Sequence, residues 1–149
     1  MEASIDKIFE YLSSYNSSEV QEYGIDLAGN IHSLSVFIMP IESTLLWENC
    51  AKILIKKQDE ELELYYPELL EWLQDMKWPG ADLIYDRLVN VSNEYFTNAY
   101  EYCLLLAKQT QDHPWEMALI DLLKDRKAKG MRDEETVLLS PDEKDETLE

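Results

Sequence analysis

The residue types that most often carry out chemistry are scarce in this sequence. It contains only two histidines and two cysteines in 149 residues. His32 and His113 lie far apart, and His113 directly precedes Pro114, a position more typical of a turn or helix cap than of a general base. The sequence has no C-x-x-C, no H-E-x-x-H, no calcium-loop spacing and no glycine-rich phosphate loop. We therefore expect no catalytic, cofactor-binding or metal-binding residues, and we predict that the protein is not an enzyme.

Pairs of carboxylates are the remaining candidates for acid–base chemistry. Asp82 and Asp86 are four residues apart, as are Asp121 and Asp125, so each pair shares one face of a helix. A general acid needs a carboxyl group that is desolvated enough to raise its pKa. A basic residue lies beside each pair in the sequence, which favours two solvated helix faces. A hydrolase that uses paired carboxylates is a further hypothesis, in addition to the two given below. A divalent metal bound tightly to the purified protein would support it.

The most unusual property of the composition is its strongly negative net charge. The chain has 31 acids and 13 bases, a formal net charge of −18, together with 46% hydrophobic residues. The hydrophobic content is enough for a core, while the charge repels nucleic acid and anionic membranes and attracts basic proteins. We expect a basic protein as partner, and neither nucleic acid nor membrane.

The sequence also predicts where the protein resides. Its first residues, MEASIDKIFEYL, have no basic segment of the kind that opens a signal peptide, and no apolar run approaches the roughly 20 residues that span a bilayer. We therefore expect a cytoplasmic protein. Cys50 and Cys103 are accordingly expected to be reduced and buried.

The apolar spacing is helical almost throughout the chain. Ser4 is expected to begin the first helix, and Ser18 with Gln21 forms a predicted capping box at the second. Gly24 lies on the apolar face of that second helix and predicts close packing, and residues 33–39 suggest a short helix. Prolines are expected at the first position of three later helices: Pro67, Pro79 and Pro114.

The spacing of prolines also suggests how the helices are arranged. Pro40, Pro79 and Pro114 are separated by 39 and 35 residues, close to one repeat of a HEAT-like array. We predict an all-α fold of stacked antiparallel helical hairpins, a HEAT- or armadillo-like right-handed array of about seven to eight helices, with a plain helical bundle as the alternative. Residues 1–130 form one domain in this interpretation, and residues 131–149 form an acidic, disordered C-terminal tail.

The stretch LLEWLQDMKWPG, residues 69–80, is the most distinctive motif. Its leucines are expected in the core, with Trp72 on a flank and Trp78 at a corner between two helices. Gly80 is small and allows the two helices to approach closely. We interpret the stretch as a tightly built helix corner in preference to a ligand site.

The longer stretch LLEWLQDMKWPGADLIYDRL, with SSEVQEYGIDLAG and LLWENCAKIL before it, resembles an uncharacterised bacterial family of unknown function. An L-L-x-W-L-Q-D-M-x-W-P core marks that family, and the resemblance covers most of residues 18–123. The family usually has Asn where this chain has Lys77. The resemblance implies an all-helical, HEAT-like fold and a small accessory protein, with some members among the immunity proteins of bacterial toxin systems. It implies no catalytic residues.

The leading functional hypothesis is a non-enzymatic protein-binding module. In its specific form, the protein is an immunity protein that neutralises a basic toxin, such as a nuclease, through its acidic surface. The alternative is a helical scaffold or homo-oligomer whose acidity only keeps it soluble and whose interface is apolar and aromatic. The candidate partner-binding residues are acids from stretches without Lys or Arg, and one tryptophan: Glu19, Glu22, Asp26, Glu42, Glu60, Glu61, Glu63 and Trp72.

Overall fold

The protein is built from helices. A computed structural model describes residues 4–130, and within that range the chain forms seven α-helices, four short 3-10 helices and no strand. The prediction of an all-α fold with about seven helices is confirmed. The predicted tail, residues 131–149, lies outside the described residues. The α-helices are α1 (Ile5–Leu12), α2 (Ser18–Ala28), α3 (Trp47–Leu54), α4 (Tyr66–Glu71), α5 (Ala81–Val89), α6 (Asn93–Gln109) and α7 (His113–Ala128), and the 3-10 helices are η1 (Leu34–Phe37), η2 (Thr44–Leu46), η3 (Glu63–Tyr65) and η4 (Trp72–Gln74).

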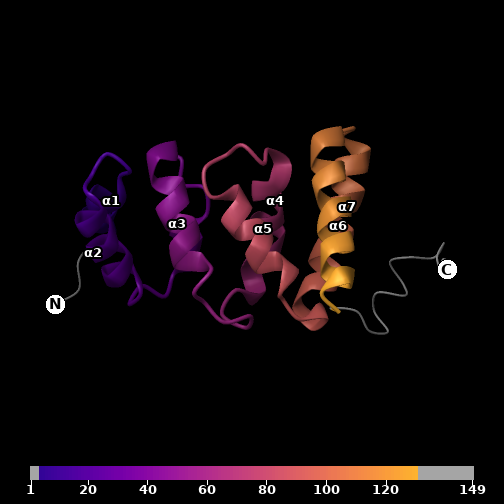
Figure 1. Ribbon diagram of the computed structural model, residues 1–149, viewed down its shortest axis with the longest axis horizontal. Helices are drawn as coiled ribbons and strands as arrows, with labels where there is room; N and C mark the ends of the chain where they lie inside the picture. The colour runs from indigo at the N-terminus through magenta and orange to yellow at the C-terminus, as the bar shows by residue number, and fades with distance from the viewer. Residues whose placement is uncertain (1–3, 131–149) are drawn as a thin grey trace.

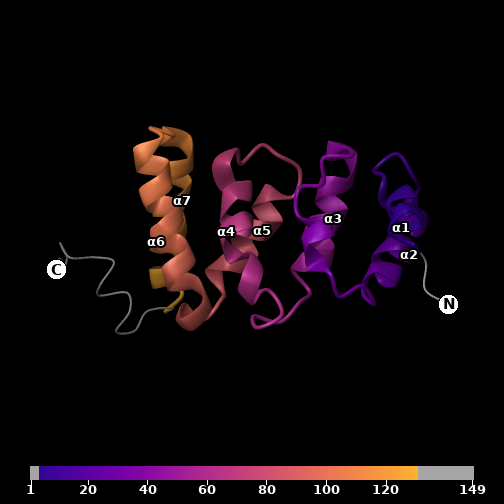
Figure 2. The ribbon, with the colours of Figure 1, turned by 180° about the vertical axis from the view of Figure 1, so that it is seen from behind.

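The helices stand side by side in one row, with α1 and α2 at one end and α6 and α7 at the other (Figure 1). Helix α2 contacts α3, α3 contacts α5, and α5 contacts α7, while α4 packs on α6. The two opposite views show α5 and α7 on one side of the row and α4 and α6 on the other (Figures 1 and 2). The assignment of this row to the HEAT-like class stays a prediction.

Serine side chains start the first two helices. Ser4 caps α1, as predicted, and its hydroxyl accepts a hydrogen bond from the amide of Lys7 at 3.2 Å. Helix α2 is capped by Ser17, where the backbone is extended (φ −63°, ψ 159°). The predicted capping box of Ser18 and Gln21 is therefore wrong, because Ser18 is already helical and cannot act as the cap.

Two of the three predicted helix-starting prolines lie in the first turn of a helix. Pro67 and Pro114 occupy the second position of α4 and α7, one residue later than predicted, where a missing N–H still costs no hydrogen bond. The prediction for Pro79 is wrong. Helix α5 begins at Ala81, and its N-cap is Gly80 in the left-handed conformation with φ +84°. This conformation favours glycine over any residue with a Cβ atom.

The first three helices are held together by close packing and one buried amide. A Cβ atom at Gly24 would lie 2.7 Å from the Cβ of Tyr11, which confirms the predicted close approach of α1 and α2. Asn49 in α3 is 2% exposed. Its amide nitrogen donates to the carbonyl of Leu12 at 2.7 Å and to the side-chain oxygen of Gln21 at 2.8 Å. One side chain thus links α1, α2 and α3.

The tryptophan-rich stretch forms the corner between α4 and α5. The indole N–H of Trp72 donates to the carbonyl of Pro79 at 3.0 Å, which closes the corner. Trp47 lies edge-on to both Trp72 and Trp78, with ring centroids 6.0 and 5.5 Å away. A Cβ atom at Gly80 would lie 2.8 Å from a side chain of α3. The tightly packed corner that the sequence predicts is present.

Candidate functional site

All seven acids predicted to bind a partner are exposed. Glu19, Glu22 and Asp26 occupy positions i, i+3 and i+7 of α2, so they form one stripe on that helix, here called the α2 stripe. No ion pair within residues 4–130 involves any of the three. The α2 stripe therefore presents three negative charges that no described basic side chain offsets.

The other four predicted acids lie in loops and turns. Glu60, Glu61 and Glu63 belong to the segment between α3 and α4, here called the acidic segment (residues 55–65). Lys57 in this segment donates to the carbonyl of Gly29, the C-cap of α2, at 3.4 Å, so the start of the acidic segment reaches the end of α2. The seventh acid follows Pro40 in the turn before η2: Glu42.

The eighth predicted partner-binding residue is not on the surface. Trp72 is 0% exposed, and its indole N–H is already bonded within the corner. A partner cannot touch this ring, so the assignment of Trp72 to a binding surface is wrong. The physical reason is that the corner closes over the indole, because Trp47, Pro79 and Gly80 all contact or bond to it.

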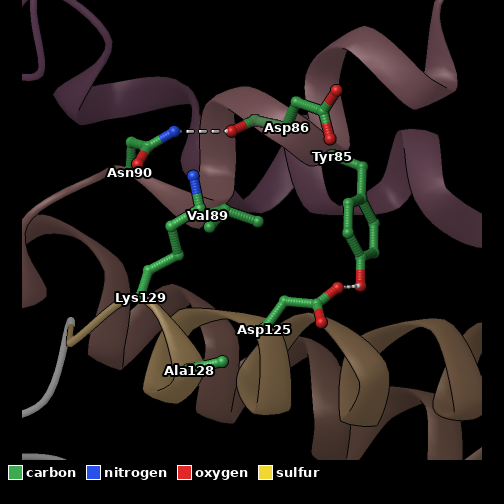
Figure 3. A pocket seen from close by; sticks show the side chains of 7 residues that line it. All are labelled: Tyr85, Asp86, Val89, Asn90, Asp125, Ala128 and Lys129. Atoms are coloured by element: carbon green, nitrogen blue, oxygen red, sulfur yellow. Dashed lines mark hydrogen bonds between the residues drawn. The ribbon is translucent and has the colours of Figure 1, made fainter.

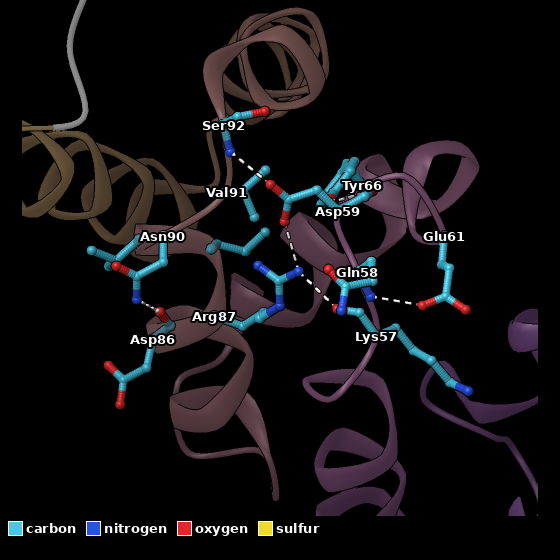
Figure 4. A network of polar contacts seen from close by, with 12 residues as sticks. Lys57, Gln58, Asp59, Glu61, Tyr66, Asp86, Arg87, Asn90, Val91 and Ser92 are labelled. Atoms are coloured by element: carbon cyan, nitrogen blue, oxygen red, sulfur yellow. Dashed lines mark hydrogen bonds and ion pairs between the residues drawn. The ribbon is translucent and has the colours of Figure 1, made fainter. Parts of the chain in front are cut away.

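A polar network fixes the acidic segment to the rest of the fold (Figure 4). Asp59 accepts from the guanidinium of Arg87 at 2.7 Å with one oxygen and from the amide of Ser92 at 3.1 Å with the other. Arg87 also donates to the carbonyl of Lys57 at 2.8 Å. Burial, followed by the charge of Asp59, raises the pKa of Tyr66, whose hydroxyl donates to the Asp59 carbonyl. The network joins the acidic segment to α5 and to the start of α6.

One member of each carboxylate pair lines a cleft between α5 and α7. This cleft has a volume of about 530 Å³, and Asp86 and Asp125 both line it (Figure 3). The hydroxyl of Tyr85 donates to Asp125 across the cleft at 2.6 Å. Burial raises the pKa of Tyr85, and the hydrogen bond to Asp125 with the charges of neighbouring carboxylates raises it further. All four aspartates are exposed, as a solvated face predicts, but sequence spacing did not reveal that two of them share a cleft.

The cysteines and histidines are the remaining described side chains with reactive chemistry. Cys50 and Cys103 are free and buried, as predicted, and burial raises the pKa of each thiol to about 12. No group of three or more His, Cys, Asp or Glu side chains among the described residues could hold a metal ion. His113 lies in the first turn of α7, with its imidazole 3.9 Å from Glu116.

Sequence reasoning missed the role of Arg126. This residue lies in the last turn of α7, yet it is 0% exposed. Its guanidinium donates to the carbonyl of Leu88 at 2.7 Å and to that of Val91 at 2.8 Å, and also to the side-chain oxygen of Asn93. Arg126 therefore joins α7 to the junction of α5 and α6. Its position seven residues after Leu119, on the core face of α7, is the signal that could have revealed it.

The fold and its exposed carboxylates define an all-α protein with an acidic surface. Residues 48–147 match the family described as Domain of unknown function (DUF5071), and the chain belongs to that family. The prediction of an uncharacterised domain family is confirmed, although the match starts later and ends later than the predicted resemblance over residues 18–123. No curated protein and no solved structure matches the chain. None of the helices in residues 4–130 has the length and apolar character needed to cross a membrane.

Proposed function

We propose that this chain is a non-enzymatic protein-binding module whose acidic surface binds a basic protein. The observation that supports this most directly is the α2 stripe, in which Glu19, Glu22 and Asp26 are all exposed on one helix face. Exposed carboxylates that take part in no described ion pair produce a negative potential that attracts a basic surface. Such complementarity speeds encounter and selects the partner more than it adds affinity.

The acidic segment extends this surface. Glu60, Glu61 and Glu63 are exposed on a segment that the Asp59–Arg87 ion pair holds in place, and the segment lies next to the end of α2. A fixed position lowers the entropy that binding must otherwise remove from the loop. The α2 stripe and the acidic segment together are the proposed contact surface.

In the specific form of this proposal, the protein is an immunity protein with a HEAT-like helical array. Its carboxylates take the places that nucleic-acid phosphates would occupy on a basic toxin such as a nuclease. The overall charge supports this form. Residues 131–149 contain 8 of the 31 acids and 2 of the 13 bases, so residues 1–130 keep 23 acids and 11 bases, a net charge of −12.

The self-associating scaffold is the second candidate, and one observation favours it. Tyr102 and Leu105 of α6 are 58% and 56% exposed and lie three residues apart, so they share a helix face. An apolar contact between two copies at this face would not weaken as salt is added, because added salt screens charges and leaves apolar burial intact. The interface would then lie on α6, and Trp72 would take no part in it.

A pull-down from lysate of the source organism at low and at high salt separates the two candidates. The proposed function predicts that a basic protein is held at low salt and released at high salt. Recovery of additional copies of the bait alone, equally at both salt concentrations, would contradict it and support the scaffold. Mass spectrometry identifies the bound proteins, and a bait with Tyr102→Ser and Leu105→Ser tests the α6 face directly.

A further inference from the structure

We infer that a groove along α7 binds a short basic peptide segment that carries one apolar anchor and one arginine. This inference rests on the proposed function, because it names a recognition element that a basic partner would use. The groove consists of two clefts of about 530 Å³ each, both of which α7 helps to line. It is separate from the α2 stripe, which lies at the opposite end of the row of helices (Figure 1).

Both clefts lie beside one row of residues that runs along α7. Met117 and Asp121 line the first cleft, and Asp125 and Lys129 line the second. These four residues, the last of which is the C-cap of α7, recur every fourth position, so the stripe that they form winds around the helix by about 40° at each step. A ligand that lies along this stripe would therefore enter both clefts.

One part of the first cleft is apolar and suited to an anchor side chain, while Gln74, Asp75, Lys77 and Asp121 line the rest. Met76 from the corner and Met117 from α7 are 39% and 56% exposed and face the same cleft, together with Pro114 and Ala118. Methionine side chains are flexible and polarisable, and they adapt to apolar groups of different shapes. Such exposed methionines are typical of surfaces that accept an apolar side chain of a partner.

The second cleft has the chemistry to hold a guanidinium group. Asp86 of α5 and Asp125 of α7 approach it from opposite walls, and the Tyr85 ring lies between the two helices (Figure 3). Two carboxylates can accept the forked donors of arginine, and an aromatic ring offers its face to the cation. The Lys129 side chain reaches across the cleft toward Val89 and Asn90, on the side away from Asp125 (Figure 3), and its charge would repel a second cation, so it limits the site to one positive charge.

The helix geometry sets the spacing of the ligand. Met117 and Asp125 are eight residues apart on α7, which at about 1.5 Å per residue places them about 12 Å apart along the helix axis. An extended peptide rises about 3.3 Å per residue, and the rotation of about 80° between the two positions lengthens its path, so its apolar residue and its arginine would be at least about four residues apart. The sequence Leu-Ala-Ala-Ala-Arg meets this requirement.

The test is a titration of the full ¹⁵N-labelled chain with the peptide acetyl-Leu-Ala-Ala-Ala-Arg-amide, followed by NMR. We expect saturable shifts of backbone amides in residues 85–90 and 117–129. A peptide with citrulline in place of arginine keeps the shape and removes the charge, and it should bind at least tenfold more weakly. Asp125→Asn and Asp86→Asn should each weaken the arginine peptide at least threefold, while Glu101→Gln on the exposed part of α6 should leave it unchanged.

Equal binding of the arginine and citrulline peptides, or shifts confined to the α2 stripe, would overturn the inference. We expect Asp86→Asn to stay folded, because the Asp86 carboxylate is exposed and accepts no described hydrogen bond. Weaker binding by this variant can therefore not be attributed to unfolding.

The outcome for the groove and the outcome for the proposed function can be told apart. If the peptide binds the groove but no basic protein is recovered from lysate, the groove assignment stands and the proposed function is contradicted. If a basic partner is recovered and binds Asp125→Asn and Asp86→Asn as tightly as the unaltered chain, the groove assignment is overturned and the proposed function stands.

Discussion

The guanidinium carbon of Arg126 lies 3.7 Å from the centroid of the Phe96 ring. The arginine belongs to α7 and the phenylalanine to α6, and both side chains are 0% exposed. A cation stacked on an aromatic face is attracted by the ring electrons, more strongly when water is excluded. Because the same guanidinium also donates to carbonyls at the end of α5, one charged side chain holds three helices together.

Replacing Arg126 should therefore destabilise the fold strongly. Arg126→Met keeps much of the side-chain volume, but it removes the guanidinium donor of the buried Val91 carbonyl and Asn93 side-chain oxygen, and it leaves the Leu88 carbonyl with a backbone amide as its donor. We expect a loss of about 3 kcal/mol in the free energy of unfolding, since each unsatisfied buried group costs about 1–3 kcal/mol. Urea unfolding measured by circular dichroism gives the value. Lys124→Met, on the exposed side of the same helix, should remain near the unaltered stability, and an equal loss in both variants would contradict the role of Arg126.

The two left-handed glycines provide a matched pair of substitutions. Gly80 and Gly130 have φ of +84° and +82°, but a Cβ atom at Gly80 would meet Ala51 at 2.8 Å, while one at Gly130 would meet nothing within 4 Å. Gly130→Ala should cost about 1 kcal/mol for backbone strain alone. Gly80→Ala should cost about 3 kcal/mol, because overpacking adds to the same strain. Thermal unfolding compares the two, and similar melting temperatures would show that the corner is not tightly packed.

Removing one charge from the polar network should loosen the acidic segment. Asp59→Asn weakens the acceptor of both the Arg87 guanidinium and the Ser92 amide. We expect the Ser92 amide to exchange its hydrogen at least tenfold faster, as measured by NMR in deuterated buffer. Glu60→Gln removes a neighbouring exposed charge that takes part in no described hydrogen bond, so its Ser92 exchange rate should stay unchanged. Unchanged exchange in Asp59→Asn would mean that the network does not hold this segment.

The cysteine thiols should be inert in the folded protein. A pKa of about 12 leaves a thiolate fraction on the order of 10⁻⁴ at pH 8, and both sulfur atoms are buried. We expect labelling by a disulfide reagent at pH 8 to be at least a hundredfold slower than for the chain unfolded in guanidinium chloride. Fast labelling of the native protein would contradict the burial of Cys50 and Cys103.

The same thiols predict how stability depends on pH. Their ordinary pKa of 9.0 applies to the unfolded chain, and the folded value is about 12, so the unfolded state loses its protons first. The free energy of unfolding should therefore be insensitive to these groups below pH 9 and should fall as the pH rises from 9 toward 12. A Cys50→Ala, Cys103→Ala variant should show a shallower fall, and an identical slope would contradict the raised pKa values.

Local patterns in the sequence predicted much of the fold. The cap at Ser4, the close approach at Gly24 and the buried leucines of residues 69–73 follow from spacing within one or two helical turns. The wrong predictions for the start of α2 and for Trp72 also concern local structure, and each has a physical explanation. Two consecutive serines made the start of α2 ambiguous by one residue, and Trp72 was placed on a flank because periodicity cannot show that a following corner folds back over it.

Contacts between distant residues could not be predicted from one sequence. Asp59 forms an ion pair with Arg87, 28 residues later in the sequence, and Tyr85 donates a hydrogen bond to Asp125, 40 residues later. No helical spacing links either pair. These contacts depend on how the helices pack against one another, and the spacing of residues within one helix carries no information about that packing. The candidate surface was therefore predicted as a set of acids, while its anchoring network and the cleft beside α7 emerged only from the structure.

The measurement that tests the central claim most directly is a pull-down with the α2 stripe neutralised. Glu19→Gln, Glu22→Gln and Asp26→Asn together remove three charges from one exposed helix face. A control with Glu68→Gln, Glu94→Gln and Glu101→Gln removes three charges from exposed positions of α4 and α6. We predict that the stripe variant loses most of the basic partner held at low salt, while the control retains it. Equal recovery by the stripe variant and the unaltered chain would contradict binding through this surface.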